Sequence, residues 1–213
     1  MPRLKNKKLC VFDFDGTLVQ SMEAFANIAA TLIQERYDLD YDKARSLYLD
    51  TSGLPFVEQL ESMFPGDPRN PSAVDAFEQR KLAGYFTAPF EESLEETITY
   101  LRSKGIKVAI SSNNHQQVLD RFLNKARVRF DVVLGYRDNF SKGSTHFQHL
   151  LHRLKITGDM MIFVGDSLKD AEKAKSHGID FVAKTGTFTK QAFQRSFPGV
   201  PVIDRLRDLK TLL

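Results

Sequence analysis

The chain has 213 residues, a length that suits one ordinary domain or a compact core with a smaller inserted domain. Its 42% hydrophobic and 27% charged residues exclude a disordered chain, and its single cysteine excludes a disulfide scaffold. Because the net charge is only +3 and no apolar run approaches about 18 residues, we expect a soluble cytoplasmic protein without nucleic-acid or membrane partners.

Short apolar runs alternate with amphipathic stretches along most of the chain. The runs are rich in β-branched and aromatic residues, which is typical of strands that are buried on both faces. We expect strands at 9–14, 107–111, 130–134, 160–164 and 179–183, with a weaker sixth at 200–203. Helices are expected between them at 93–103, 113–125, 145–154 and 167–177, the first opened by a capping box of Ser93 and Glu96. This alternation predicts an α/β fold with a doubly wound parallel sheet.

One interval is too long for a crossover between neighbouring strands. Between the first strand and the helix at 93–103, helical patterns recur at 22–36, 42–49, 55–63 and 71–85, with Gly- and Pro-containing breaks between them. We therefore predict a helical domain inserted into the sheet domain. The expected bounds are 1–20 and 88–213 for the α/β core and 21–87 for the insert.

Acidic residues follow the first and fourth expected strands. Alternation along a strand points Asp13 and Asp15 the same way, and Asp166 ends a strand that shares the same carboxyl edge of a parallel sheet. At ~4 Å and an effective dielectric constant of ~20, each pair of like charges costs about 4 kcal/mol. A hard divalent cation removes this repulsion, and an all-oxygen ligand set suits Mg²⁺.

Two further residues are suited to binding an anion near those carboxylates. Ser112 follows the second strand, where we expect a helix N-terminus whose free N–H groups favour a phosphate. Lys142, in the segment Ser-Lys-Gly, adds a positive charge for the same anion. Together with the carboxylates, these residues point to Mg²⁺-assisted phosphoryl transfer.

Four motifs occur in the order and spacing of a known family: DFDGT at 13–17, SSN at 111–113, SKG at 141–143 and VGDSLKD at 164–170. On these motifs the chain resembles the haloacid dehalogenase-like hydrolase superfamily. The helical insert between the first two motifs resembles the branch that contains phosphoglycolate-phosphatase-like enzymes. The resemblance implies a Rossmann-like core with an inserted α-helical cap domain.

The resemblance also implies catalytic roles. Asp13 is expected to attack phosphorus and form an aspartyl-phosphate, and Asp15 to protonate the leaving oxygen and later to deprotonate water. Lys142 is expected to offset the charge of the nucleophile and phosphate, and Asp170 to orient Lys142.

Binding roles follow in the same way. Mg²⁺ is expected to bind the Asp13 carboxylate, the backbone carbonyl of Asp15, and Asp166. Ser112 and the backbone of Asn113 are expected to hold the transferring phosphoryl group, together with Lys142.

The function expected from these residues is that of a Mg²⁺-dependent phosphatase acting on a small phosphorylated metabolite, as a monomer or homodimer. Asp15 disfavours dehalogenation, because a halide leaves without a proton. A phosphomutase similar to β-phosphoglucomutase and a non-catalytic phosphate-binding module are the alternatives.

Two smaller hypotheses concern the insert and a row of histidines. The Gly-Leu-Pro turn at Gly53, between two helices of the insert, is a candidate for substrate selection. His146, His149 and His152 recur every three residues and spread around a helix instead of converging on a metal, so we expect them at the surface.

Overall fold

The computed structural model describes residues 4–213, which form two compact units. One unit is the chain up to Val19 together with Phe90–Leu213, and the other is Gln20–Pro89. The first unit holds every strand and the second holds four helices. The sequence predicts 21–87 for the insert.

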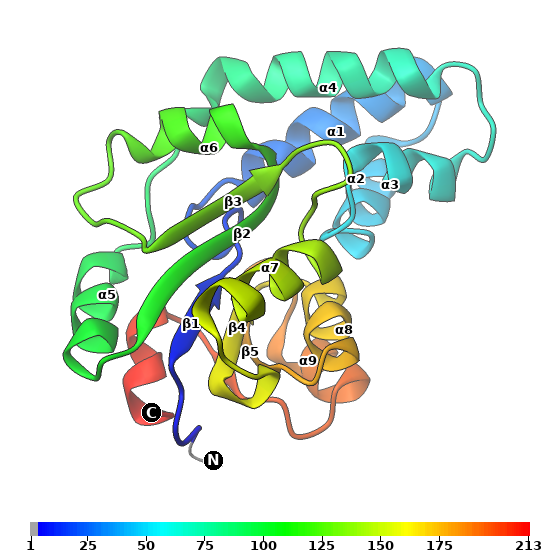
Figure 1. Ribbon diagram of the computed structural model, residues 1–213. Coiled ribbons are helices and arrows are strands. Elements are labelled where there is room, and N and C mark those ends of the chain that lie inside the picture. The colour runs from blue at the N-terminus through cyan, green and yellow to red at the C-terminus, as the bar shows by residue number, and fades with distance from the viewer. Residues whose placement is uncertain (1–3) are drawn as a thin grey trace. The chain divides into compact units, whose positions relative to one another are not determined.

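The first unit is built on a six-stranded parallel sheet with the order β3-β2-β1-β4-β5-β6 (Figure 1). β1 is central and entirely buried, which explains its uninterrupted apolar sequence. The strands are β1 (Leu9–Phe12), β2 (Lys107–His115), β3 (Val132–Tyr136), β4 (Met161–Gly165), β5 (Asp180–Lys184) and β6 (Val202–Ile203). The predicted α/β fold is confirmed, including the weak sixth strand.

Helices cover both faces of the sheet. Phe147 of α7 and Phe193 of α9 pack on one face, together with Leu9, Val11 and Phe163 of the sheet. The helices of this unit are α5 (Leu94–Ser103), α6 (Gln116–Leu123), α7 (Ser144–Leu154), α8 (Leu168–Ser176) and α9 (Lys190–Ser196), with short 3-10 helices η1 (Gly158–Met160) and η2 (Leu206–Thr211). Neither α9 nor η2 was predicted from the sequence.

The end of β2 differs from the sequence expectation. The strand continues to His115, with a shift in its pairing with β3 between Ser111 and His115, and α6 begins only at Gln116. Ser112 therefore lies within an irregular strand end, so the predicted placement of Ser112 at a helix N-terminus is wrong. The asparagines after Ser112 explain the error, because asparagine is common at helix N-caps.

The second unit is a group of four helices with an aromatic core. The helices are α1 (Met22–Tyr37), α2 (Tyr41–Asp50), α3 (Phe56–Met63) and α4 (Asn70–Tyr85), close to the predicted ranges. The rings of Phe56 and Phe77 stack with their centroids 4.1 Å apart, and Tyr48 packs against both. Phe25 packs against Phe77, and Tyr85 packs against Phe25. Within residues 4–213, no helix combines the length and hydropathy that a bilayer span requires.

The two chain segments that leave the sheet unit for the helical unit are paired with each other. Val19 and Phe90 form an antiparallel bridge, and the N–H of Glu91 donates to the carbonyl of Leu18 at 2.8 Å. Both ends of the insert are therefore held at one place in the sheet unit.

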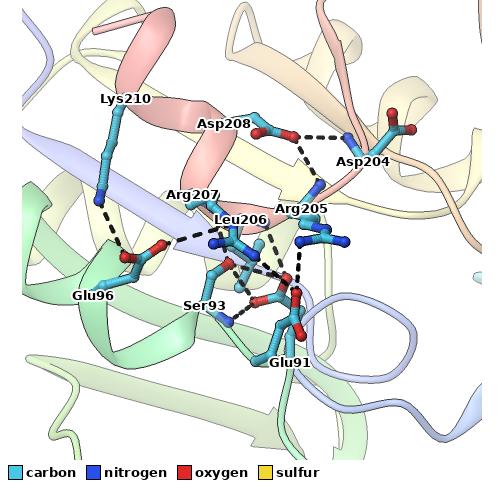
Figure 2. Close-up of polar contacts among 10 residues, drawn as sticks. Glu91, Ser93, Glu96, Asp204, Arg205, Leu206, Arg207, Asp208 and Lys210 are labelled. Carbon is cyan, nitrogen blue, oxygen red and sulfur yellow. Dashed lines mark hydrogen bonds and ion pairs between the residues drawn. The ribbon is translucent and has the colours of Figure 1, made fainter.

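The C-terminal helix η2 is fastened to the start of α5 by polar contacts (Figure 2). The buried Glu91 carboxylate accepts from the N–H and hydroxyl of Ser93 and, at 3.4 Å, from the N–H of Leu206. The Ser93 hydroxyl also accepts from the N–H of Arg207, while Glu96 pairs with Arg207 and Lys210. The predicted capping box of Ser93 and Glu96 is therefore wrong: both side chains bind η2 instead of the end of α5.

Candidate active site

Asp13 and Asp15 follow β1 at the carboxyl edge of the sheet. The N–H of Asp13 donates to the Val164 carbonyl at 2.8 Å, which extends the pairing of β1 with β4 by one residue. The Asp13 side chain is buried and Asp15 is half-buried. Between them, Phe14 points into the core and packs edge-on against Phe122 of α6.

Lys142 is a buried lysine held between two carboxylates. Its ammonium nitrogen lies 2.9 Å from Oδ1 of Asp13 and 2.8 Å from Oδ1 of Asp170. The next residue, Gly143, has φ 115°, a conformation that L side chains rarely adopt, and it directly precedes α7. The Ser-Lys-Gly segment thus turns the chain so that Lys142 reaches the end of β1 while α7 packs on the sheet.

Asp166 follows β4 and accepts hydrogen bonds on both carboxylate oxygens. Thr17 donates to Oδ1 at 3.0 Å, and Thr187 donates to Oδ2. Thr17 belongs to the DFDGT motif, whereas Thr187, in the loop after β5, was not predicted. Only its place after another strand of the parallel sheet could have indicated it.

Asp170 lies in the first turn of α8 and is fully buried. Ser167 caps this helix by accepting from the Asp170 N–H at 3.1 Å, and its hydroxyl donates to Oδ2 of Asp170 at 2.7 Å. A Cβ on Gly165 would lie 2.8 Å from that same Oδ2, so only glycine leaves room for the carboxylate. Gly165 and Ser167 therefore allow the Asp170 carboxylate to lie next to the Lys142 ammonium.

Burial and mutual repulsion change the protonation of these groups. Desolvation raises the pKa of Asp13 well above its usual value, Lys142 opposes the rise, and Asp170 and Asp166 add to it. Desolvation and the Asp170 charge raise the pKa of Asp166 to about 6. Burial alone would lower the pKa of Lys142, but its attraction to Asp13 and Asp170 raises it above the ordinary value. The ammonium thus stays charged.

The same carboxylates meet the requirements of a divalent-cation site. One oxygen each from Asp13, Asp166 and Asp170 lie within 4.8 Å of one another, and all three residues are buried. The Lys142 ammonium pairs with Asp13 and Asp170, whereas Asp166 accepts only from threonine hydroxyls among the contacts described, so a cation would balance the remaining negative charge. An all-oxygen ligand set suits Mg²⁺. The expected binding of the Asp15 backbone carbonyl to this cation stays a prediction, and the Asp15 carboxylate accepts a hydrogen bond from the side-chain amide of Asn114.

The serine and asparagines in the last part of β2 lie in the same sheet unit. Ser112 is buried, Asn113 is half-buried, and the Ser112 hydroxyl accepts from the N–H of Asn114 at 3.1 Å. The expected contacts of Ser112 and the Asn113 backbone with a phosphoryl group stay predictions. Gly53 belongs to the separate helical unit, where it has φ 94° between α2 and α3.

One histidine is buried, contrary to the expectation for all three. His146 has no exposed surface, and its Nδ1 lies 2.9 Å from the hydroxyl of Ser111. His149 and His152 are exposed on α7, as expected. Ser111 directly precedes Ser112 and His146 lies one helical turn after Lys142, so this contact ties two site segments together. A sequence pattern cannot reveal it, because it pairs two separate elements.

A parallel α/β sheet with buried carboxylates at its carboxyl edge has its candidate site where open α/β sheets bind their ligands. The profile of the haloacid dehalogenase-like hydrolases matches residues 10–184, and the chain belongs to that family. The predicted family and the prediction of a hydrolytic enzyme are both confirmed.

The chain aligns with named relatives over nearly its whole length. The chain is 28% identical to a phosphoglycolate phosphatase of Salmonella paratyphi A, covering 98% of this chain and 93% of that one. It is 23% identical to the pyrophosphatase PpaX of Bacillus mycoides, covering 95% of each. A solved structure of a haloacid dehalogenase-like hydrolase from Bacteroides fragilis superposes with a TM-score of 0.81 at 22% identity, covering 95% of this chain and 99% of that one.

Proposed function

We propose that this enzyme is a Mg²⁺-dependent phosphatase that hydrolyses a small phosphomonoester through an aspartyl-phosphate on Asp13. The observation that carries the proposal is the contact of Asp13 with the charged Lys142 within a cluster of buried carboxylates. Such a cluster is costly unless positive charge compensates it, which supports a role in binding a metal and a phosphate.

In the first step, a carboxylate oxygen of Asp13 attacks phosphorus and the bond from phosphorus to the substrate oxygen breaks. Asp15 gives its proton to that oxygen, which leaves as an alcohol. In the second step, Asp15 takes a proton from water, and the water oxygen attacks phosphorus. The acyl-phosphate bond breaks, phosphate is released and the Asp13 carboxylate is restored. The ammonium of Lys142 reduces the repulsion between Asp13 and the approaching phosphate.

Asp13, Asp166 and the backbone of Asp15 would hold the Mg²⁺ ion, with Asp170 beside it. When bound, the cation supplies positive charge for the phosphoryl oxygens as negative charge develops on them. Thr17 and Thr187 keep the Asp166 carboxylate in a fixed orientation, whereas Asp170 keeps Lys142 directed at Asp13.

The relatives guide the choice of substrates. Phosphoglycolate and pyrophosphate are the first candidates, because relatives described as phosphoglycolate phosphatases and a pyrophosphatase align with most of the chain. We propose that residues 20–89 act as a cap that selects among them through the loop at 51–56. Gly53 is a poor place to test this, since φ 94° strains any other residue. Leu54→Ala is the better variant, and it should change KM or substrate preference.

The test is phosphate release from p-nitrophenyl phosphate, phosphoglycolate and pyrophosphate, with Mg²⁺ and with EDTA. Wild type should turn over at least one of them only with Mg²⁺, and Asp13→Asn should abolish turnover. Asp75→Asn makes the same chemical change at an exposed position of α4 and should keep wild-type activity.

Equal turnover by wild type and Asp13→Asn would show that Asp13 is not the nucleophile. Isomerisation of a sugar phosphate without release of phosphate would identify the phosphomutase instead. Phosphate binding without any turnover would identify the binding module. The cytoplasmic location and the monomeric or homodimeric state are parts of the same proposal, to be checked by fractionation and by light scattering.

A further inference from the structure

Asn114 joins two parts of the candidate site that lie far apart in sequence. Its side-chain Nδ2 donates to Oδ2 of Asp15, across 99 positions of the chain, and its backbone N–H donates to the Ser112 hydroxyl at 3.1 Å. The side chain is buried, whereas Asp15 is half-buried. Asn114 thus contacts both the residue assigned to proton transfer and a residue assigned to phosphate binding.

The local backbone explains how Asn114 reaches Asp15. β1 and β2 are neighbours in register, with Phe12 opposite Ile110, so the segments that follow them run side by side. The pairing of β2 with β3 is irregular between Ser111 and His115, a stretch that includes Asn114. Irregularities of this kind redirect side chains and are common beside active sites.

The chemistry of this hydrogen bond is directional. A carboxylate only accepts, so the nitrogen of the amide, and not its oxygen, faces Asp15. Because this N–H already occupies a lone pair of Oδ2, it favours Oδ1, the other oxygen of the carboxyl group, as the site of a proton carried by Asp15. The contact therefore restricts both the rotation of the Asp15 carboxyl and the atom from which it delivers a proton.

From this geometry we propose that Asn114 is a positioning residue, which orients Asp15 so that Oδ1 protonates the leaving oxygen. The proposal rests on the proposed function, since it assigns a helper to its general acid. The proposal predicts that loss of the Asn114 side chain slows the hydrolysis of some substrates more than others. Substrates with a poor leaving group need the proton from Asp15, and those with a good leaving group do not.

The experiment compares Asn114→Ala with wild type on phosphoglycolate, which releases an alcohol, and on p-nitrophenyl phosphate, which releases a stable phenolate. Loss of a hydrogen bond to a charged group should lower kcat for phosphoglycolate about tenfold or more, with a much smaller loss on p-nitrophenyl phosphate. KM should change little. Asn124→Ala, at an exposed residue just after α6, is the matched control.

A double-mutant cycle with Asp15→Asn separates positioning from a general structural role. If Asn114 acts through Asp15, Asn114→Ala should add no further loss in that background. An equal loss on both substrates, or a full additional loss in Asp15→Asn, would overturn the proposal.

A readout without turnover tests the contact itself. In the NMR spectrum of ¹⁵N-labelled protein, the side-chain amide resonance that disappears in Asn114→Ala should shift in Asp15→Ala. If Asn114→Ala folds poorly, Asn114→Ser is a smaller truncation that can replace it. An unshifted resonance would overturn the contact. A different result would contradict the proposed function itself: turnover that survives in Asp13→Asn, or no turnover in wild type. No turnover in wild type would also overturn the role of Asn114 in catalysis.

Discussion

The hydroxyl of Ser111 and Nδ1 of His146 lie 2.9 Å apart, and neither residue is exposed. This contact connects β2, just before Ser112, with the first turns of α7, just after Lys142. Because burial disfavours the charged imidazolium, the pKa of His146 falls to about 4 in the folded protein.

Acid should therefore weaken the fold through His146. The unfolded chain has a histidine pKa of about 6.5, so it binds a proton at pH values where the folded protein does not. The stability is fully present above pH ~6.5 and is lost as the pH falls towards ~4, by roughly 2–3 kcal/mol. Urea unfolding at several pH values should show a weaker pH dependence in His146→Gln than in wild type. His152→Gln, at an exposed position on the same helix, should keep the wild-type dependence.

Gly165→Ala should damage both stability and activity. The added Cβ would meet the Asp170 carboxylate at 2.8 Å and displace it from Lys142. Overpacking of this kind costs about 1–3 kcal/mol, which thermal unfolding will detect. Phosphatase kcat should fall, because Lys142 loses one of its two carboxylates.

Gly84→Ala is the control for that substitution. Gly84 lies in α4, and a Cβ there meets nothing within 4 Å. This variant should unfold at the same temperature as wild type or higher, because alanine favours a helix by up to about 1 kcal/mol over glycine. A Gly165→Ala variant as stable and active as Gly84→Ala would contradict the packing that we describe.

Mg²⁺ should stabilise the wild-type protein and do so less in Asp166→Asn. A cation bound to the folded state alone raises the unfolding temperature with its concentration, and EDTA reverses the effect. The variant lacks one of three buried carboxylates in the cluster, so its shift should be smaller. Asp138→Asn, at an exposed turn, should respond like wild type. Equal shifts in all three proteins would place the cation elsewhere.

Glu91→Ala should destabilise the C-terminal attachment far more than Glu92→Ala. The Glu91 carboxylate is buried and serves Ser93 and Leu206, so its removal leaves donors unsatisfied at a cost of about 1–3 kcal/mol. Glu92 pairs with Arg205 and Arg207 at the surface, where such pairs contribute about 0–1 kcal/mol. Denaturant unfolding of the two variants measures this difference, and equal effects would refute the ranking.

The fold was predictable because local patterns agreed with one another. Apolar runs such as 9–12 and 161–164 are buried in the sheet, and the helices of the insert begin and end close to their predicted residues. The positions of Asp13 and Asp166 were predictable because strand ends of a parallel sheet share one edge, whereas Asp170 was indicated only by the resemblance of its motif.

What the sequence could not show depends on contacts between distant segments. Asn114 meets Asp15, and Thr187 meets Asp166, through the order of strands in the sheet, which no short motif encodes. The spacing of the three histidines predicted His146 at the surface. That spacing gives no information on Ser111, the residue of β2 that contacts His146. The continuation of β2 past Ser111 was not predicted, because the serine and asparagines that follow are also common at helix N-caps.

The bridge between Val19 and Phe90 has a consequence for how this architecture can change. Hydrogen bonds within the sheet unit join the two ends of the insert. The insert is therefore attached to the sheet unit in the way that a loop is attached to the two strands of a hairpin. Loop-closure entropy grows only slowly with loop length, so inserts of quite different size can replace residues 20–89 at similar cost to the sheet. If residues 20–89 act as the proposed cap, substrate preference can then change while the edge of the sheet that carries Asp13 and Asp166 stays the same.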